Sequence, residues 1–261
     1  MNIHPFTVSL TPDYLYITPA LEATRLKVRF VLNHRQGLTC IMGDVGMGKS
    51  SILRLIYGEY VQREDVRAVL IPTPSFVSEF AFLKGVCQQF QLRPRRSLYD
   101  QQLEFENYLN DQFAADRNVI VFIDEAQMLK GAQLEMVRTM LNFEDNNHKL
   151  IQIVLAAQLE LRDSLKDASK KALRSRIVAP SILAPLTPQE TAAMIRHRCD
   201  KAGITVPFTD DAIHKIYTLA NGTPRDVLKI CSTSYELAQG LGEKMVTVEL
   251  VEESSGVAVF S

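Results

Sequence analysis

Hydrophobic residues follow two spacings along the chain. Short, nearly uninterrupted runs cover residues 38–42, 68–71, 119–123 and 150–157, and such runs, often rich in β-branched residues, are typical of buried parallel strands. Between and around them, apolar residues recur every three or four positions and predict helices at 21–33, 78–90, 99–115 and 133–143. Strands that alternate with helices predict an α/β fold with a three-layer α/β/α parallel sheet.

The two ends of the chain have a different pattern. Residues 1–20 contain Pro5, Pro12 and Pro19 with aromatic residues between them, which predicts an extended arm. After Pro180 no further buried strand is evident, and the spacing predicts helices at 189–202, 209–220 and 224–239. We therefore expect an α/β domain with its N-terminal arm at 1–184 and an all-helical domain at 185–261.

Composition narrows the class of protein without defining it. The 261 residues are 46% hydrophobic and 23% charged, as in ordinary globular proteins, and no apolar run is long enough to cross a bilayer. The N-terminus does not resemble a signal peptide, and the four cysteines lie far apart. We expect a cytoplasmic protein with reduced thiols. A net charge of −1 gives no overall attraction to nucleic acid, so DNA binding would need local basic patches.

A glycine-rich segment follows the first predicted strand and precedes a helical run. Gly43 to Ser50 fits the spacing G-x-x-x-x-G-K-[ST] of a phosphate-binding loop. Glycines let successive backbone N–H groups surround a polyphosphate, the lysine adds a cation, and the serine offers a hydroxyl to Mg²⁺. The predicted phosphate-binding residues are Gly43, Asp44, Val45, Gly46, Met47, Gly48, Lys49, Ser50 and Ser51. The alternative is an incidental glycine-rich turn.

Two carboxylates follow the most apolar of the predicted strands. Asp124 and Glu125 would lie at the carboxyl end of the sheet, where ligands bind in open α/β folds. Asp124 would hold Mg²⁺, directly or through water, and Glu125 would polarise the water that attacks the γ-phosphate. A solvated pair that caps the next helix is the alternative.

The two segments G-D-V-G-M-G-K-S and V-I-V-F-I-D-E-A-Q together resemble the Walker A and Walker B motifs of AAA+ ATPases. Five further segments are similar to the branch that contains the general secretion pathway protein A ATPases and the ATPase subunits of DNA transposition systems. They are T-P-D-Y-L-Y-I-T-P-A (11–20), I-V-L-A-A-Q-L-E-L (153–161), L-R-S-R-I (173–177), L-T-P-Q-E-T (186–191) and N-G-T-P-R (221–225). The resemblance implies a P-loop NTPase fold with a C-terminal helical lid, and ATP and Mg²⁺ as cofactors.

The resemblance also implies roles for individual residues. Gln158 matches sensor 1, which positions the lytic water, and Arg225 matches sensor 2, which reaches the γ-phosphate from the lid. Arg176 matches an arginine finger supplied to the neighbouring subunit, with Arg174 as the second candidate. The alternatives are a polar strand end for Gln158, an exposed helix-start residue for Arg225, and a surface salt bridge for the other two arginines.

A finger supplied in trans implies a homo-oligomer, either a ring or a helical filament. We expect an ATPase that assembles on duplex DNA and regulates or recruits a transposase or recombinase. Candidate DNA contacts are two basic clusters that could equally be solvated surface: Arg93, Arg95 and Arg96, and Lys166, Lys170 and Lys171. The alternatives are a secretion-type ATPase or a nucleotide-dependent adaptor that does not bind DNA. Secretion relatives generally carry a membrane span after the ATPase core, whereas this chain ends at Ser261, which favours the DNA-acting role.

Overall fold

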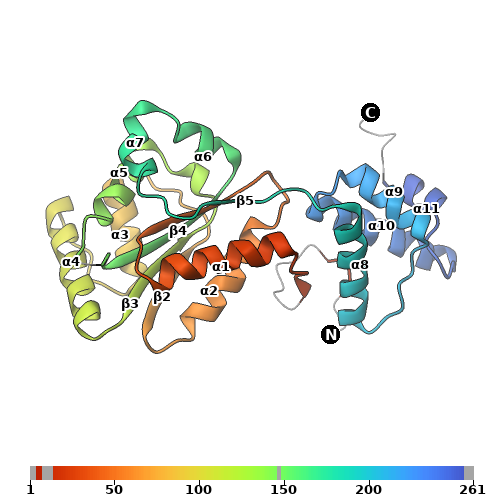
Figure 1. Cartoon of the computed structure of the whole chain (residues 1–261), viewed down its shortest axis with the longest axis horizontal. Helices are drawn as coiled ribbons and strands as arrows, with labels where there is room; N and C mark the ends of the chain where they lie inside the picture. Colours follow the sequence, from red (N-terminus) through yellow and green to blue (C-terminus); the bar gives the residue numbers. More distant parts are fainter. Residues whose placement is uncertain (1–3, 8–13, 146–147, 256–261) are drawn as a thin grey trace. The chain divides into compact units, whose positions relative to one another are not determined.

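A computed structural model of the chain describes residues 4–7, 14–145 and 148–255. The contacts divide the chain into two compact units (Figure 1). The sheet unit comprises residues 19–44 and 52–183, and the helical unit comprises residues 1–18, 45–51 and 184–261. We expect the N-terminal arm and the glycine-rich segment within the first domain, whereas the contacts group residues 1–18 and 45–51 with the C-terminal helices and leave Gly43 and Asp44 in the sheet unit. Residues 1–3 and 8–13 of the predicted arm lie outside the described residues.

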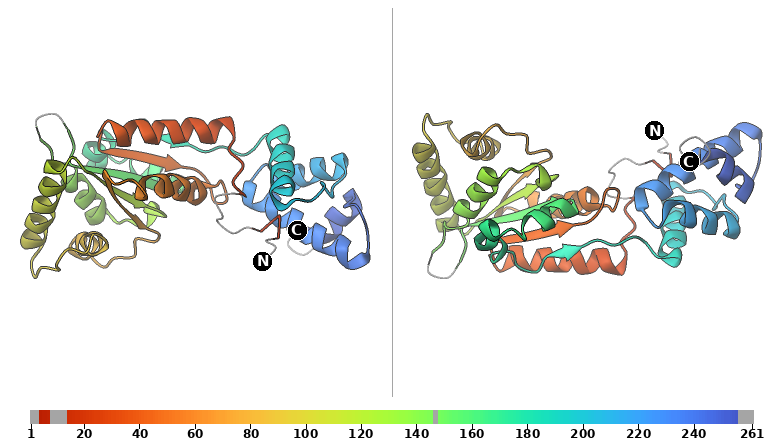
Figure 2. Two further views of the ribbon diagram at one scale, coloured as in Figure 1. Left: turned by 90° about the horizontal axis from the view of Figure 1, so that it is seen from below. Right: turned by 90° about the horizontal axis from the view of Figure 1, so that it is seen from above.

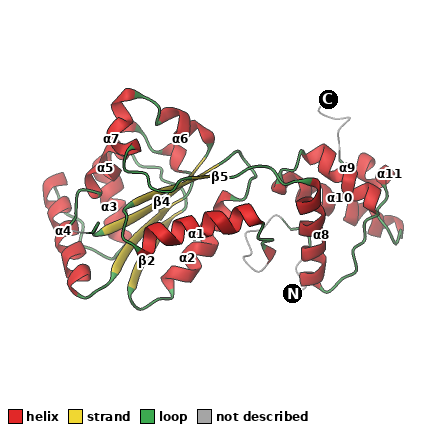
Figure 3. Cartoon of the chain, in the orientation of Figure 1, coloured by secondary structure: helices red, strands yellow, loops and turns green. Residues whose placement is uncertain are grey.

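The sheet unit is built on five parallel strands in the order β2-β3-β4-β1-β5 (Figure 3). The strands are β1 (Leu38–Met42), β2 (Val66–Ile71), β3 (Asn118–Ile123), β4 (Ile151–Ala157) and β5 (Ser181–Ile182). The parallel α/β fold is therefore confirmed. The expectation that no strand follows Pro180 is wrong, because the two residues of β5 pair with the end of β1.

Helices cover both faces of this sheet in three layers (Figure 2). The helices α3 (Glu79–Gln89), α4 (Leu98–Ala114) and α5 (Gly131–Met140) share one core with alternate residues of β3, including Val119, Val121 and Ile123. On the other face, α1 (Pro19–Asn33) contacts β1, and Tyr57 of α2 (Lys49–Val61) packs against Phe122 at 5.6 Å between ring centroids. Strands covered on both faces explain the continuous apolar runs.

Short helical pieces connect the later strands of the sheet unit. They are the 3-10 helix η2 (Ala126–Met128), α6 (Leu159–Ser164), the 3-10 helix η3 (Ala168–Lys170) and α7 (Lys171–Arg174). The apolar spacing predicts none of them, because each is too short for a helical period to repeat. Three of these pieces nevertheless contribute to the core: Ala126 of η2 is fully buried, and Leu161 and Leu173 are 2% and 3% exposed.

The helical unit contains α8 (Pro188–Ala202), α9 (Asp210–Ala220), α10 (Pro224–Leu241) and α11 (Val248–Ser254). The first three match the predicted helices, and α11 was not predicted. Their core includes Phe6 of the arm, which is fully buried and meets Phe208 at 5.3 Å between ring centroids. Arg198 of α8 fixes this part of the arm by donating to the carbonyl oxygens of Thr7 at 2.8 Å and Pro5 at 3.2 Å. Burial lowers the pKa of the Arg198 guanidinium.

All four cysteines are free and buried. Within the part of the chain that the structure describes, no helix is both long enough and apolar enough to span a membrane.

Candidate active site

Strand β1 leads directly into the glycine-rich segment at the carboxyl edge of the sheet. The Gly43 N–H donates to the carbonyl oxygen of Ala157, at the end of β4, at 3.3 Å. A Cβ atom at position 43 would lie only 3.1 Å from the carbonyl oxygen of Leu183. Gly43 therefore lies close to the ends of β4 and β5, where a larger residue would be crowded. Asp44 follows at the same edge of the sheet.

The remainder of the segment turns through two glycines before α2 begins at Lys49. Gly46 and Gly48 have φ values of +84° and +89°, a region that favours glycine. Lys49 is only 6% exposed, so it is largely enclosed by the protein. Ser50 and Ser51 follow in the first turn of α2, and the backbone N–H groups at the start of a helix favour an anion. Of the other two residues, Met47 is buried and Val45 is 55% exposed.

Within the helical unit, the turn before α10 contacts this glycine-rich segment. The Arg225 N–H donates to the Gly46 carbonyl oxygen at 3.2 Å, and a Cβ atom on Gly46 would lie 2.9 Å from Cγ2 of Thr223. The Arg225 side chain is exposed, and no hydrogen bond or ion pair from its guanidinium is found among the described residues. Its backbone is thus anchored to the segment, while its cation remains available.

The same turn is fixed to the start of the helical unit through Gly222. The Leu186 N–H donates to the Gly222 carbonyl oxygen at 2.8 Å. Gly222 has φ +68°, and a Cβ atom there would lie 2.2 Å from the Leu186 carbonyl oxygen. Glycine is required at this position both by conformation and by the close approach of the two backbones.

The predicted acidic residues lie together at the carboxyl end of β3. Asp124 is 4% exposed, and its backbone N–H donates to Ile71 at the end of β2, at 2.9 Å. Its Oδ1 atom accepts the Glu125 N–H at 2.9 Å. Glu125 takes a left-handed backbone conformation with φ +51° and ψ +37°. The chain turns sharply here, and the Glu125 carboxylate faces the end of β4.

Gln158, the residue that follows β4, meets this carboxylate. Its Nε2 atom lies 3.4 Å from Oε2 of Glu125, a long hydrogen bond. The structure thus brings Asp124, Glu125 and Gln158 together at neighbouring strand ends, on the sheet edge from which Gly43 leaves β1. No two of these three residues are close in sequence except the acidic pair.

Gln127, which is not among the residues predicted from the sequence, lies between Glu125 and Gln158. Its Nε2 atom donates to Oε2 of Glu125 at 2.5 Å, and its Oε1 atom accepts the Gln158 backbone N–H at 3.1 Å. Gln127 appears in the quoted segment D-E-A-Q, but no motif position draws attention to it. An amide two residues after the acidic pair is the only signal that the sequence offers.

The two candidate finger arginines are both bonded to backbone carbonyl groups of their own chain. Arg176 is partly buried and donates to the Arg138 carbonyl oxygen at 2.7 Å, in the last turn of α5. Arg174 is exposed and donates to the carbonyl oxygens of Leu165 at 3.1 Å and Lys166 at 3.2 Å, just beyond α6. Neither guanidinium pairs with a carboxylate among the described residues.

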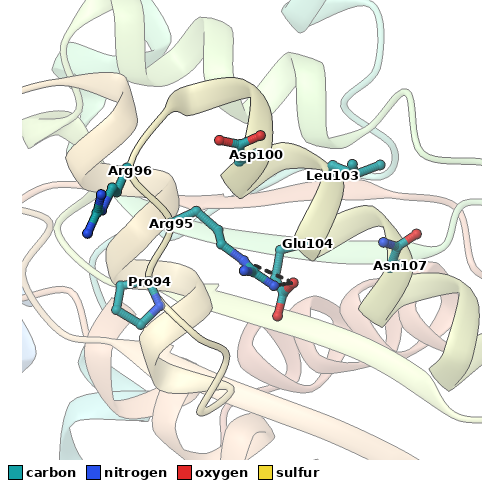
Figure 4. A pocket seen from close by; sticks show the side chains of 7 residues that line it. All are labelled: Pro94, Arg95, Arg96, Asp100, Leu103, Glu104 and Asn107. Carbon is teal, nitrogen blue, oxygen red and sulfur yellow. Dashed lines mark hydrogen bonds and ion pairs between the residues drawn. The ribbon is translucent and has the colours of Figure 1, made fainter.

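The two basic clusters are partly neutralised by acidic neighbours. Figure 4 shows Arg95 directed at Glu104 of α4. The nitrogen–oxygen distance of this ion pair is 2.5 Å, and Arg96 forms no ion pair among the residues that the structure describes. In the second cluster, Lys166 pairs with Asp163 at 2.7 Å, and this hydrogen bond lowers the pKa of the Asp163 carboxyl group. Lys170 is hydrogen-bonded to Ser164. In each cluster one cation is therefore paired with a carboxylate, while the others form no ion pair among the described residues.

A five-stranded parallel sheet whose first strand leads through a glycine-rich segment into a helix defines a P-loop nucleotide-binding fold. The family model described as AAA domain matches residues 32–165, just over half of the 261 residues. The chain belongs to this family and is an AAA+ ATPase. Proteins of this class use ATP, with Mg²⁺ as the usual partner ion.

Among curated proteins, General secretion pathway protein A of Aeromonas hydrophila is 30% identical over 93% of this chain and 44% of its own length. An uncharacterized HTH-type transcriptional regulator of Methanocaldococcus jannaschii is 26% identical over 84% of this chain and 63% of its own length. The chain thus spans less than two thirds of either relative.

Solved structures with the same fold have low sequence identity to this chain. Cdc6p from Pyrobaculum aerophilum has a TM-score of 0.71 at 18% identity, covering 98% of this chain and 71% of that one. A chain of Drosophila ORC bound to DNA has a TM-score of 0.73 at 15% identity, covering 98% and 64%. These similarities establish the AAA+ fold.

Proposed function

We propose that this chain binds ATP with Mg²⁺, hydrolyses it, and assembles with further copies of itself on duplex DNA to regulate or recruit a transposase or recombinase. The observation that carries the catalytic part is the arrangement of Glu125 beside Gln158 at adjoining strand ends, on the edge where β1 enters the glycine-rich segment. That edge is where ligands of parallel sheets bind.

The residues present suit a triphosphate and a hard cation. Residues 43–51 would surround the phosphates, since Gly46 and Gly48 have the positive φ values that such a loop needs. The hydroxyl of Ser50 and the carboxylate of Asp124 supply the oxygen ligands that Mg²⁺ prefers. Lys49 would neutralise phosphate charge, and Arg225 would add a second cation from the helical unit.

Glu125 and Gln158 would act on the attacking water. In hydrolysis the water oxygen bonds to the γ-phosphorus, the bond to the bridging oxygen breaks, and ADP leaves with that electron pair. Glu125 would accept the proton that the water gives up, and Gln158 would hold the water in line. Mg²⁺ held by Ser50 and Asp124 would offset the negative charge of the phosphates.

We propose assembly because Arg174 and Arg176 are candidates for a cation that one subunit supplies to the site of the next. Charge develops on the transferring phosphoryl group, and a cation from a second subunit stabilises it. We assign this role to Arg176, with Arg174 as the second candidate, in a ring or helical filament of identical subunits.

Duplex DNA as the partner is supported by relatives and neighbours rather than by charge. The similar archaeal protein is named an HTH-type transcriptional regulator, and the similar Drosophila structure is described as bound to DNA. The DNA-contacting candidates are Arg93, Arg95, Arg96, Lys166, Lys170 and Lys171. Because Arg95 and Lys166 already pair with acidic side chains, the remaining cations would carry most of the contact.

A secretion-type function is the second candidate. Its support is the 30% identity to General secretion pathway protein A over nearly the whole chain. In that case the same ATP-dependent assembly would act on an envelope complex, and the chain would be indifferent to DNA.

Electron microscopy of the purified protein with ATP, with and without duplex DNA, separates these functions. Rings or filaments that require both ATP and DNA, and that weaken as salt rises, are expected for the DNA-acting role. If the protein assembles with ATP alone and DNA does not change the assembly, the secretion role replaces the DNA-acting role. A protein that stays monomeric with ATP under both conditions would overturn the assembly itself.

A further inference from the structure

Both the nitrogen and the oxygen of the Gln127 side-chain amide form hydrogen bonds. Its nitrogen donates to Oε2 of Glu125 at 2.5 Å, and its oxygen accepts the backbone N–H of Gln158 at 3.1 Å. A backbone N–H can only donate, and an ionised carboxylate can only accept. The two partners therefore demand the same orientation of the amide, and a flipped amide would lose both hydrogen bonds.

This amide also divides the two oxygens of Glu125 into different environments. Oε2 accepts from Gln127 and, at 3.4 Å, from the side chain of Gln158. Oε1 receives no hydrogen bond from the residues that the structure describes. A carboxylate held through one oxygen with the other left open is oriented to take a proton from a water molecule.

We propose that Gln127 is a positioning residue for hydrolysis, which holds the Glu125 carboxylate in the orientation that accepts the proton and couples it to the end of β4. This inference rests on the proposed role of Glu125 as general base. The catalytic residues that the motifs predict do not include Gln127.

The local backbone explains why glutamine occupies this position. The left-handed conformation of Glu125 turns the chain into η2, where the Met128 N–H donates to the Glu125 carbonyl oxygen at 2.9 Å. Position 127 thereby returns alongside position 125. Asparagine is one methylene shorter and could not reach both partners, and glutamate would place a second negative charge against Glu125.

The test replaces Gln127 with methionine, which keeps the length and flexibility of the side chain but removes both hydrogen bonds. Gln133→Met is the matched control, because the Gln133 amide is also bonded at both ends, to the Phe76 carbonyl oxygen at 2.7 Å and the Lys130 N–H at 2.8 Å. Gln133 lies in α5 and touches none of the proposed catalytic residues in the described structure.

We expect Gln127→Met to lower kcat by about 10- to 100-fold, as for a misplaced catalytic group, with KM for ATP changed by less than about 2-fold. The control should lower the melting temperature by at least as much and leave kcat near wild type. Equal kcat for the two variants, or a higher kcat in Gln127→Met, would overturn the proposal.

A double-mutant cycle decides whether Gln127 acts through Glu125. In single-turnover hydrolysis, Gln127→Met should have little further effect once Glu125→Gln is present, because the group it positions is gone. If Gln127→Met lowers hydrolysis as much in the Glu125→Gln variant as in the wild type, the positioning role of Gln127 is overturned, while the role of Glu125 as general base is not. If Glu125→Gln alone hydrolyses ATP normally, the proposed function fails instead, so the two failures are distinguishable.

Discussion

The residues at the ends of β3 and β4 and the arginines near α7 have two different roles in the proposed reaction. The structure also holds their side chains in different ways. Glu125, Gln127 and Gln158 are bonded to one another through their side chains. Arg174 and Arg176 instead donate to backbone carbonyl groups of their own chain. The groups proposed to act on water are thus already oriented within one chain, whereas an arginine proposed as the finger would have to exchange a carbonyl partner for a phosphate on another subunit.

The largest expected effect tests the first of these regions. Glu125→Gln keeps the size of the side chain but removes the proton acceptor, so hydrolysis should fall by about 10³- to 10⁴-fold while ATP binding persists. ATP-bound assemblies should then accumulate, as measured by phosphate release and light scattering. Glu160→Gln, on the exposed first turn of α6, serves as the control. Normal turnover in Glu125→Gln would remove Glu125 as the general base.

The second effect tests the arginines. Arg176→Ala should lower ATP hydrolysis by about 10³-fold, the typical contribution of an arginine finger, and Arg174→Ala should lower it far less. The two variants are matched, because each loses a guanidinium that donates to backbone carbonyl groups.

Mixing experiments show whether the arginine acts in trans. Arg176→Ala subunits retain Glu125, and Glu125→Gln subunits retain Arg176, so a mixture should recover part of the wild-type activity. If mixing restores no ATP hydrolysis, Arg176 does not act in the site of the neighbouring subunit. If Arg174→Ala loses more ATP hydrolysis than Arg176→Ala, Arg174 is the arginine finger.

A smaller effect concerns the binding of nucleotide rather than its hydrolysis. Lys49→Ala removes the ammonium group of a largely enclosed residue, and ATP affinity in isothermal titration should fall by about 100-fold. Lys149→Ala is a suitable control, since Lys149 pairs with Glu144 on the surface. Unchanged ATP affinity in Lys49→Ala would contradict the phosphate-binding role of the loop.

The smallest effect tests whether the basic residues contact DNA. Arg96→Ala should reduce the slope of log affinity against log salt by about 0.9, the contribution of one phosphate contact. Arg95→Ala should change that slope less, because Glu104 already pairs with Arg95. Fluorescence anisotropy with labelled duplex DNA measures both slopes. Equal, unchanged slopes would exclude this cluster as a DNA contact.

The fold was predictable where apolar runs were long and covered on both faces. Strand β3 has five consecutive buried residues, and such a continuous apolar run is typical of a strand that is covered on both faces. Strand β5 has two residues, one of them exposed, and lies between prolines, so nothing in its pattern marks a strand. Phe6 is buried among helices of which the first, α8, begins only at Pro188, a contact that local spacing cannot reveal.

The candidate site was predictable where a residue type is dictated by a motif. Lys49, Asp124 and Glu125 belong to spacings that the chemistry of phosphate transfer imposes. Gln127 does not, because its role depends on the left-handed turn at Glu125 and on the position of β4. Tertiary geometry alone brings its amide between the two strand ends.

The contact between Gly222 and Leu186 makes the N-G-T-P-R turn intolerant of any side chain at its second position. Even alanine would force the two backbones apart, since its methyl carbon would overlap the Leu186 carbonyl oxygen. The displacement would pass along three residues to Arg225, whose amide is bonded to Gly46. The absence of a Cβ atom at position 222 thus lets the segment before α8, the start of α10 and Gly46 remain in backbone contact, so a shift in any one of them would displace the others.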